Sequence, residues 1–165
     1  MTALRTLLAC LLFAIGTAAL AATSAPQQGV HIEHAWIRWL PANLPAAGYA
    51  EIANDSDATV RITGATSPAY GMVMLHHSRL AHGDSTMEMV DHLDIPAHGQ
   101  VTLAPGGYHL MLSHAKRPIK PGDTVRITLE LAGGAKLRAD FPVLPANASR
   151  PSNVGGPTHA PLGGS

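Results

Sequence analysis

Turn-forming residues divide most of this chain into runs that are too short for helices. From Val30 onward, glycine, proline, asparagine and aspartate recur every few residues, as at Gly83–Asp84 and Gly133–Gly134. We predict strands at 30–39, 48–53, 59–66, 71–79, 86–90, 100–103, 108–113, 124–131 and 136–143. Short strands at this spacing, without long helical patterns between them, predict an all-β protein folded as an antiparallel sandwich or small barrel.

The two ends of the chain differ from this middle part. Residues 1–22 combine an early arginine, an apolar run and small residues, which predicts a secretory signal peptide. The apolar run continues past Cys10, which favours an ordinary signal peptide over lipidation of that cysteine. We expect a linker at 23–29, one folded domain at 30–145 and a disordered tail at 146–165 that is rich in proline, glycine and serine.

The charge and the cysteine content restrict the class of protein. The formal net charge is zero, and no stretch gathers the basic residues that nucleic-acid-binding proteins use. Cys10 is the only cysteine, so removal of the signal peptide would leave a chain without disulfides or thiolate ligands. We therefore expect a periplasmic protein that binds no nucleic acid and is not stably inserted in a membrane.

Methionine and histidine are concentrated in one part of the predicted sandwich. Every methionine after Met1 lies within residues 72–111, and six of the ten histidines lie within residues 76–109. Methionine normally fills gaps in cores, where it is scattered among other apolar residues. Thioether sulfur is a soft ligand, and together with imidazole it suits Cu(I) better than zinc, magnesium or calcium. The segment therefore predicts a copper site.

Strand alternation indicates how such a site forms. Residues two apart on a strand face the same way, so His109 and Met111 share one face while Leu110 and Leu112 share the other. Met72, Met74 and His76 likewise share a face, opposite Val73 and Leu75. If the aliphatic residues form the core, the methionines and histidines point outward, where packing does not explain them.

One spacing resembles a known family. Ten residues separate His76 from Met87, twenty-one more precede His109, and Met111 follows after one. This pattern, with its Gly-Gly-Tyr-His-Leu-Met-Leu setting, resembles the signature of the periplasmic copper chaperones called PCuAC. The similarity extends over roughly residues 30–145 and includes the following segments: Ala35–Arg38, Ala47–Tyr49, Asn54, Ile95–Ala97, Pro105–Gly107 and Gly122–Asp123.

The resemblance implies a cupredoxin-like Greek-key sandwich or barrel in which His76, Met87, His109 and Met111 bind Cu(I). It also implies delivery of Cu(I) to the dinuclear CuA centre of cytochrome c oxidase subunit II, alongside a Sco-type thiol protein. No cysteine is left for a blue-copper electron-transfer centre, which needs a thiolate. Met74 and Met89 are either auxiliary ligands or apolar surface near the site, and we expect Trp36 and Tyr49 to be structural aromatics.

Two other functions compete with copper delivery. The same site would serve a periplasmic copper buffer or resistance protein that has no dedicated acceptor. A copper enzyme with an amino-terminal histidine would require cleavage directly before His31, where Gln28–Val30 make a poor cleavage site, so we do not expect an enzyme. We expect the surplus histidines 77, 82, 92, 98 and 114 to be solvated, and the first four of these offer at most a weaker second copper site.

Overall fold

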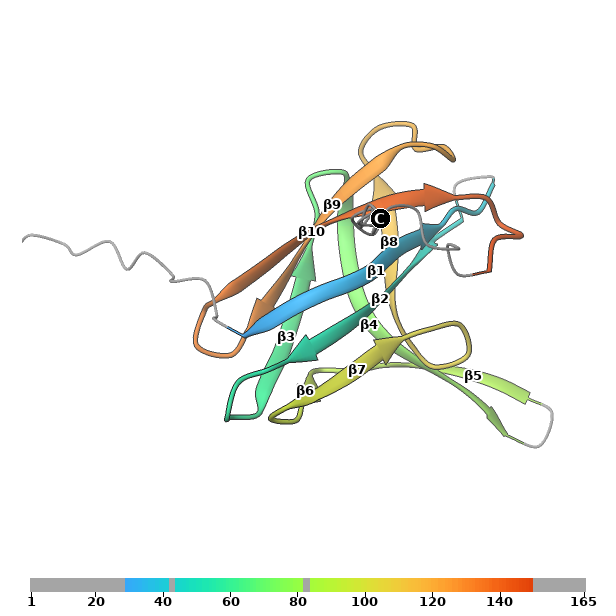
Figure 1. Cartoon of the computed structure of the whole chain (residues 1–165). Coiled ribbons are helices and arrows are strands. Elements are labelled where there is room, and N and C mark those ends of the chain that lie inside the picture. Colours follow the sequence, from blue (N-terminus) through green and yellow to red (C-terminus); the bar gives the residue numbers. More distant parts are fainter. Residues whose placement is uncertain (1–28, 42–43, 82–83, 150–165) are drawn as a thin grey trace, which may run out of the picture.

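Ten strands form the part of the chain that the computed structural model describes, residues 29–41, 44–81 and 84–149 (Figure 1). In chain order they are β1 (Val30–Arg38), β2 (Ala46–Asn54), β3 (Val60–Thr66), β4 (Tyr70–Ala81), β5 (Asp84–Met89), β6 (Leu93–Ile95), β7 (Gly99–Leu103), β8 (Tyr108–Ala115), β9 (Thr124–Leu131) and β10 (Lys136–Leu144). The predicted all-β class is confirmed. The expected signal peptide, the linker up to residue 28 and the tail from residue 150 lie outside the described residues.

The strands pair in the order β5-β4-β8-β2-β1-β10-β9-β3-β6, and β7 pairs with the other half of β2. All but one of the pairings are antiparallel, and the exception is a short parallel contact in which Ile37 and Arg38 of β1 meet Val143 and Leu144 of β10. Pro142 lies where β10 changes partners: it forms the last pair with β9, opposite Thr124, and Val143 after it pairs with β1. A residue without a backbone N–H is tolerated there because neither ladder needs its donor.

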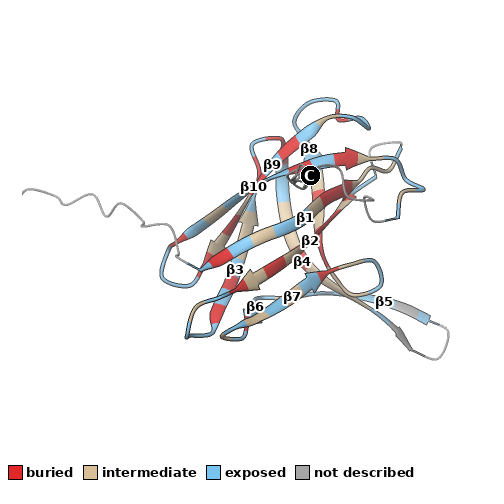
Figure 2. Cartoon of the chain, viewed as in Figure 1, coloured by how far each residue is buried: buried red, intermediate tan, exposed pale blue. Residues whose placement is uncertain are grey.

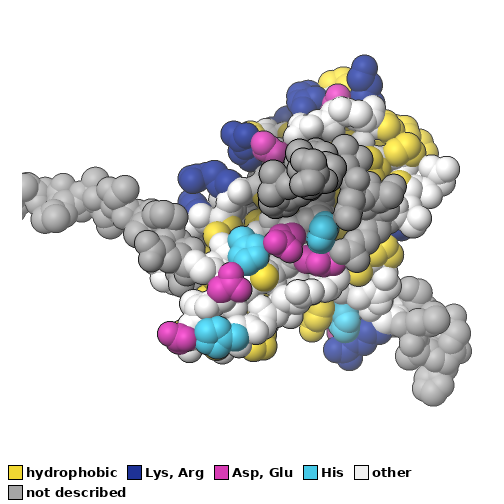
Figure 3. Space-filling model, in the orientation of Figure 1, with side chains coloured by type: hydrophobic (Ala, Val, Ile, Leu, Met, Phe, Trp, Pro, Cys, Tyr) yellow, Lys and Arg dark blue, Asp and Glu magenta, His cyan; other side chains and the backbone are white. Residues whose placement is uncertain are grey.

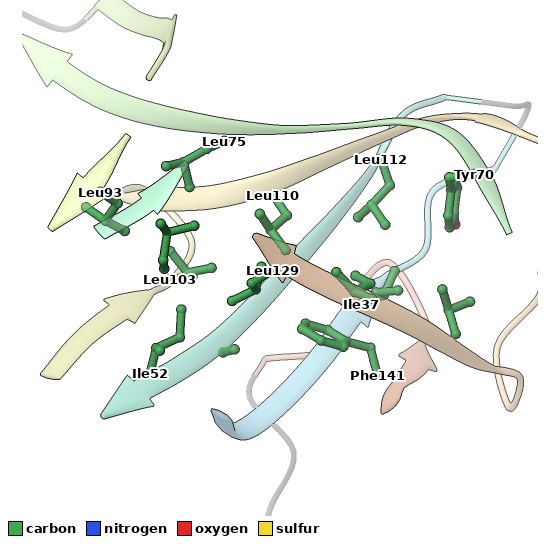
Figure 4. Close-up of a cluster of buried hydrophobic side chains, with 14 of the residues drawn as sticks. Ile37, Ile52, Tyr70, Leu75, Leu93, Leu103, Leu110, Leu112, Leu129 and Phe141 are labelled. Atoms are coloured by element: carbon green, nitrogen blue, oxygen red, sulfur yellow. The ribbon is translucent and has the colours of Figure 1, made fainter. Parts of the chain in front are cut away.

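The core lies between the two layers that this path of strands forms. Leu75 from β4 and Leu110 and Leu112 from β8 point into it, as Figure 4 shows, and are 8%, 1% and 0% exposed. Ile37, Ile52, Leu129 and Phe141 meet them from the other strands. The predicted alternation in β4 and β8 is thus confirmed for these leucines, and it leaves the opposite face of both strands for polar and sulfur-bearing side chains.

One hairpin extends away from this core. The distal half of β4 and all of β5 project from the body at the lower right of Figure 1. The described side chains of β5 are all exposed, and Figure 2 shows the contrast with the buried residues of the body. We refer to residues 76–81 and 84–89 as the hairpin arm. Among the described residues, no helix is long and apolar enough to cross a membrane.

The short strand β6 was not predicted from the sequence. Leu93 and Ile95 are buried while Asp94 between them is exposed, so the alternation is present but spans only three residues. The strands predicted at 71–79 and 86–90 are longer toward their connection than expected, because pairing continues past them to Ala81 and Asp84.

Candidate metal centre

Two histidines lie side by side on neighbouring strands. In the antiparallel pair of β4 and β8, His76 is directly opposite His109, and the centres of the two rings are 5.9 Å apart. Each histidine lies on the strand face opposite its leucine neighbour, Leu75 or Leu110, and therefore faces away from the main core. The two histidines are thirty-three positions apart in the sequence, and the pairing of β4 with β8 brings them together.

Two methionines form the next pair on the same face. Met74, two residues before His76 on β4, is the register partner of Met111, two residues after His109 on β8, and both are half-buried. A pair of imidazoles therefore lies beside a pair of thioethers. Two members of the predicted ligand set, His109 and Met111, come from β8, and Met74 occupies the β4 position opposite Met111. This places Met74, for which the sequence left two roles open, on the same face of β4 as His76 and directly opposite Met111.

The hairpin arm brings two further methionines to the other side of His76. Met89 is directly opposite His76 in the pairing of β4 with β5, while Met87 is opposite Ser78. Met87 is therefore a diagonal neighbour of His76, a position that long side chains still span. Met87 and Met89 are 56% and 66% exposed. The sequence spacing favoured Met87 as the ligand. The register places Met89 at least as close to His76 as Met87 is.

The histidine nitrogens differ in their hydrogen bonding. His109 Nδ1 lies 3.1 Å from the carbonyl oxygen of Gly107, which can only accept, so Nδ1 carries the proton and donates it. This tautomer leaves a lone pair on His109 Nε2. Both ring nitrogens of His76 are buried without any hydrogen-bond partner. Buried polar atoms are nearly always satisfied, so an orphaned imidazole points to a ligand that completes it.

His109 differs from its prediction in one respect. It was expected to point outward into solvent, but it is only 6% exposed. Tyr49 lies beside it with ring centres 6.4 Å apart, and Trp36 packs on Tyr49 at 4.7 Å. The guanidinium of Arg38 lies 5.3–5.4 Å from both of these aromatic ring centres. A small aromatic cluster on the outer face therefore buries His109, although the ring is on the predicted side of β8.

The environment of His76 keeps its ring neutral. Burial lowers the pKa of His76 below its ordinary value of 6.5, and the nearby His109 lowers it further because two charged rings would repel each other. A neutral imidazole is the form that binds a metal ion. The environment thus favours the ligating form of His76 at lower pH than a solvated histidine would allow.

This pKa shift predicts an acid-sensitive stability for the copper-free protein. As pH falls below 6.5, the unfolded chain binds a proton at His76, whereas the folded chain binds it only at lower pH. The folded state therefore loses stability relative to the unfolded state. We expect the free energy of unfolding in urea to fall more for the wild-type protein than for His76→Leu between about pH 7.5 and about pH 5. Equal losses in the two proteins would contradict this assignment.

The remaining histidines have separate surroundings. His77 stacks on Tyr108 with ring centres 4.2 Å apart and accepts a hydrogen bond from Arg79. His98 pairs with Asp57 at 2.8 Å, and His92 and His114 are exposed. His82 lies outside the described residues. His77 lies on the opposite face of β4 from His76.

The family is shown by comparison with known proteins. A family model described as "Putative lipoprotein LpqE-like" matches residues 30–143. This chain belongs to the LpqE-like family. The LpqE-like chain is also 33% identical over 116 residues to "Putative lipoprotein Lxx21020" of Leifsonia xyli subsp. xyli (strain CTCB07), across 70% of this chain and 69% of that protein.

Solved structures resemble the LpqE-like chain across most of its described part. The apo PCuAC domain of PmoF2 matches with a TM-score of 0.61 and 26% identity, covering 74% of this chain and 95% of that domain. The solution structure of Cu(I)-DR1885 from Deinococcus radiodurans matches with a TM-score of 0.57 and 35% identity, covering 75% of this chain and 85% of that one. The predicted PCuAC resemblance and cupredoxin-like fold are both confirmed.

Proposed function

We propose that this chain is a copper chaperone that carries Cu(I) outside the cytoplasm and delivers it to the CuA site of cytochrome c oxidase subunit II. The observation that carries the proposal is the pairing of His76 with His109, with the nitrogens of His76 buried and unpartnered, beside the paired thioethers of Met74 and Met111. Imidazole and thioether together favour Cu(I) over the harder metal ions.

We assign the cargo to His76, Met87, His109 and Met111, with Met89 and Met74 next to them. All of these donors are neutral, so a bound Cu(I) ion keeps one positive charge and is not locked in place by charge neutralisation. No thiolate is among them, so each copper bond exchanges more readily than a bond to cysteine. Such a site suits transfer of the ion more than electron transfer or catalysis, and we propose no enzymatic reaction for it.

The relatives support the cargo and the compartment. The DR1885 structure was determined with Cu(I), and the PmoF2 domain has also been solved in a copper-bound form that is 25% identical to this chain. The family and the Leifsonia protein are described as lipoproteins, which are exported from the cytoplasm. Export of this chain through residues 1–22 is part of the proposal, with a Sco-type thiol protein acting alongside it to keep the acceptor cysteines reduced.

Copper transfer to the acceptor tests the proposal directly. We mix the Cu(I)-loaded protein anaerobically with the reduced, metal-free CuA domain of subunit II and separate the two by chromatography. Thiolates bind Cu(I) more strongly than thioethers, so we expect most of the copper on the acceptor within minutes.

An acceptor with alkylated cysteines provides the matched control and should take up no copper. Retention of Cu(I) by this protein at equilibrium, with the acceptor thiols confirmed as reduced, would contradict delivery. The same site would then be assigned to a periplasmic copper buffer.

A further inference from the structure

A second group of metal-binding side chains lies on the outer face of β1 and β2. One imidazole nitrogen of His34 and one carboxylate oxygen each of Glu33 and Glu51 all lie within 4.8 Å of one another. Figure 3 shows histidine and acidic side chains gathered over this part of the molecule. Tyr49, which lies two residues before Glu51 on the same face of β2, is beside His109 with ring centres 6.4 Å apart. The group shares no residue with the proposed Cu(I) site.

The two carboxylates are held against each other by the strand register. Glu33 and Glu51 are directly opposite in the antiparallel pair of β1 and β2. Like charges in directly opposed positions destabilise a sheet. A cation between the two carboxylates would remove that repulsion. Two histidine rings lie close enough to the carboxylates to contribute nitrogen ligands to it. His34 Nε2 is 3.9 Å from Glu51, and His31 Nε2 is 3.4 Å from Glu33.

A bulge brings the imidazole to the carboxylates. The register of β1 and β2 shifts between Glu33 and Trp36, and His34 within this bulge has a positive φ of 50°. In a regular strand, neighbouring residues such as Glu33 and His34 face opposite ways. The bulge instead places both beside Glu51, where His34 and Glu51 line a shallow hollow together with Trp36 and Pro105.

The donor set differs in chemistry from the proposed Cu(I) site. One imidazole nitrogen and two carboxylate oxygens form a borderline-to-hard set with no sulfur, which suits a divalent ion. Among divalent first-row metals, such sites bind Cu(II) most tightly. We propose that Glu33, His34 and Glu51 form a second metal site that binds Cu(II), with His31 adjacent. This site binds its ion whether or not the first site holds Cu(I).

Titration with Cu(II) in a variant without the first site tests the proposal. In the background His76→Leu/Met111→Leu, we add Cu(II) alone and record its affinity, its electron paramagnetic resonance spectrum and the thermal midpoint of unfolding. We expect one Cu(II) ion per chain, coupling to a single imidazole nitrogen, and a rise in the thermal midpoint on binding.

Substitutions within the group should separate its contributions. Glu33→Gln removes a charge from a side chain that is about half exposed, so the copper-free protein should keep its fold while the Cu(II) affinity falls by at least about tenfold. His34→Asn should remove the nitrogen coupling, and asparagine tolerates the positive φ at this position.

His98→Asn is the matched control. His98 also has a positive φ, of 52°, and also lies beside a carboxylate, but among the described residues Asp57 is its one acidic partner. Its substitution should leave the Cu(II) affinity and spectrum unchanged. The proposal is overturned if Glu33→Gln and His34→Asn leave both unchanged, or if His98→Asn weakens binding as much as they do, since Cu(II) would then be binding to dispersed surface histidines.

Discussion

Replacement of His76 by leucine should stabilise the copper-free protein and at the same time remove its tight Cu(I) binding. Both ring nitrogens of His76 are buried without partners, and a buried unsatisfied polar group costs about 1–3 kcal/mol. Leucine removes that cost and adds apolar surface next to the methionines, so we expect the free energy of unfolding to rise by about 1–3 kcal/mol. Urea unfolding of the metal-free proteins measures this change.

The loss of Cu(I) affinity should be large. Substitution of groups that only support metal ligands costs about 10–100-fold in affinity, so removal of a ligand should cost more than about 100-fold. Competition with a Cu(I)-specific chromophoric chelator measures the effect. Gain of stability and loss of binding in one variant would show that His76 is retained for the metal and not for the fold.

His77→Leu is the control on the same strand. This neighbour faces the other way, stacks on Tyr108 and accepts a hydrogen bond from Arg79, so its ring has protein partners. The variant should keep its Cu(I) affinity and be no more stable than the wild-type protein. A His76→Leu variant that is less stable than wild type, or that binds Cu(I) normally, would remove His76 from the proposed site.

Replacement of Met111 by leucine should weaken Cu(I) binding by at least about tenfold without altering the fold. Methionine and leucine have similar volumes, and such exchanges usually cost less than about 1.5 kcal/mol. Met111 is half-buried against Met74 and Ala47, its partners on the flanking strands, and leucine fills that space equally well. The change therefore removes a sulfur donor with little effect on packing. X-ray absorption should show fewer sulfur scatterers around Cu(I).

Met72→Leu provides the comparison for this substitution. Met72 lies on the same face of β4, opposite Ser113, one pair of residues further from the histidines, and is 43% exposed. Met72→Leu removes a thioether that is outside the predicted ligand set, so the Cu(I) affinity should not change. Similar losses in Met111→Leu and Met72→Leu would mean that the methionines bind copper collectively and not as a defined set.

The sequence predicted the parts of this site that depend on local alternation. Leu110 and Leu112 alternate with His109 and Met111 along one strand, and a strand with one face in the core fixes where both sets point. The burial of His109 was not predictable in this way. It depends on Tyr49 and Trp36, which belong to strands distant in sequence and reach His109 only through the order of the sheet.

The register of the hairpin arm shows how a small error changes a ligand assignment. Ala81 pairs with Asp84, and counting back along both strands from that pair brings Met89 opposite His76. The predicted strands left the connection at 80–85 open, and a two-residue turn at Gly83–Asp84 would instead have placed Asp91 opposite His76. Each shift of a hairpin turn by one residue moves the opposing position by two, so a pattern of residue spacings could not decide between Met87 and Met89.

The position of β5 at the end of the sheet order sets a kinetic property of the site. In the described part of the chain β5 pairs with β4 alone, and its described side chains are all exposed, so opening this strand disturbs no core residue. Local opening of such an element takes far less free energy than global unfolding. If β5 supplies one donor and the body supplies the others, the rate at which the ion leaves depends on fraying of β5. Dissociation can then evolve independently of the thermal stability of the domain.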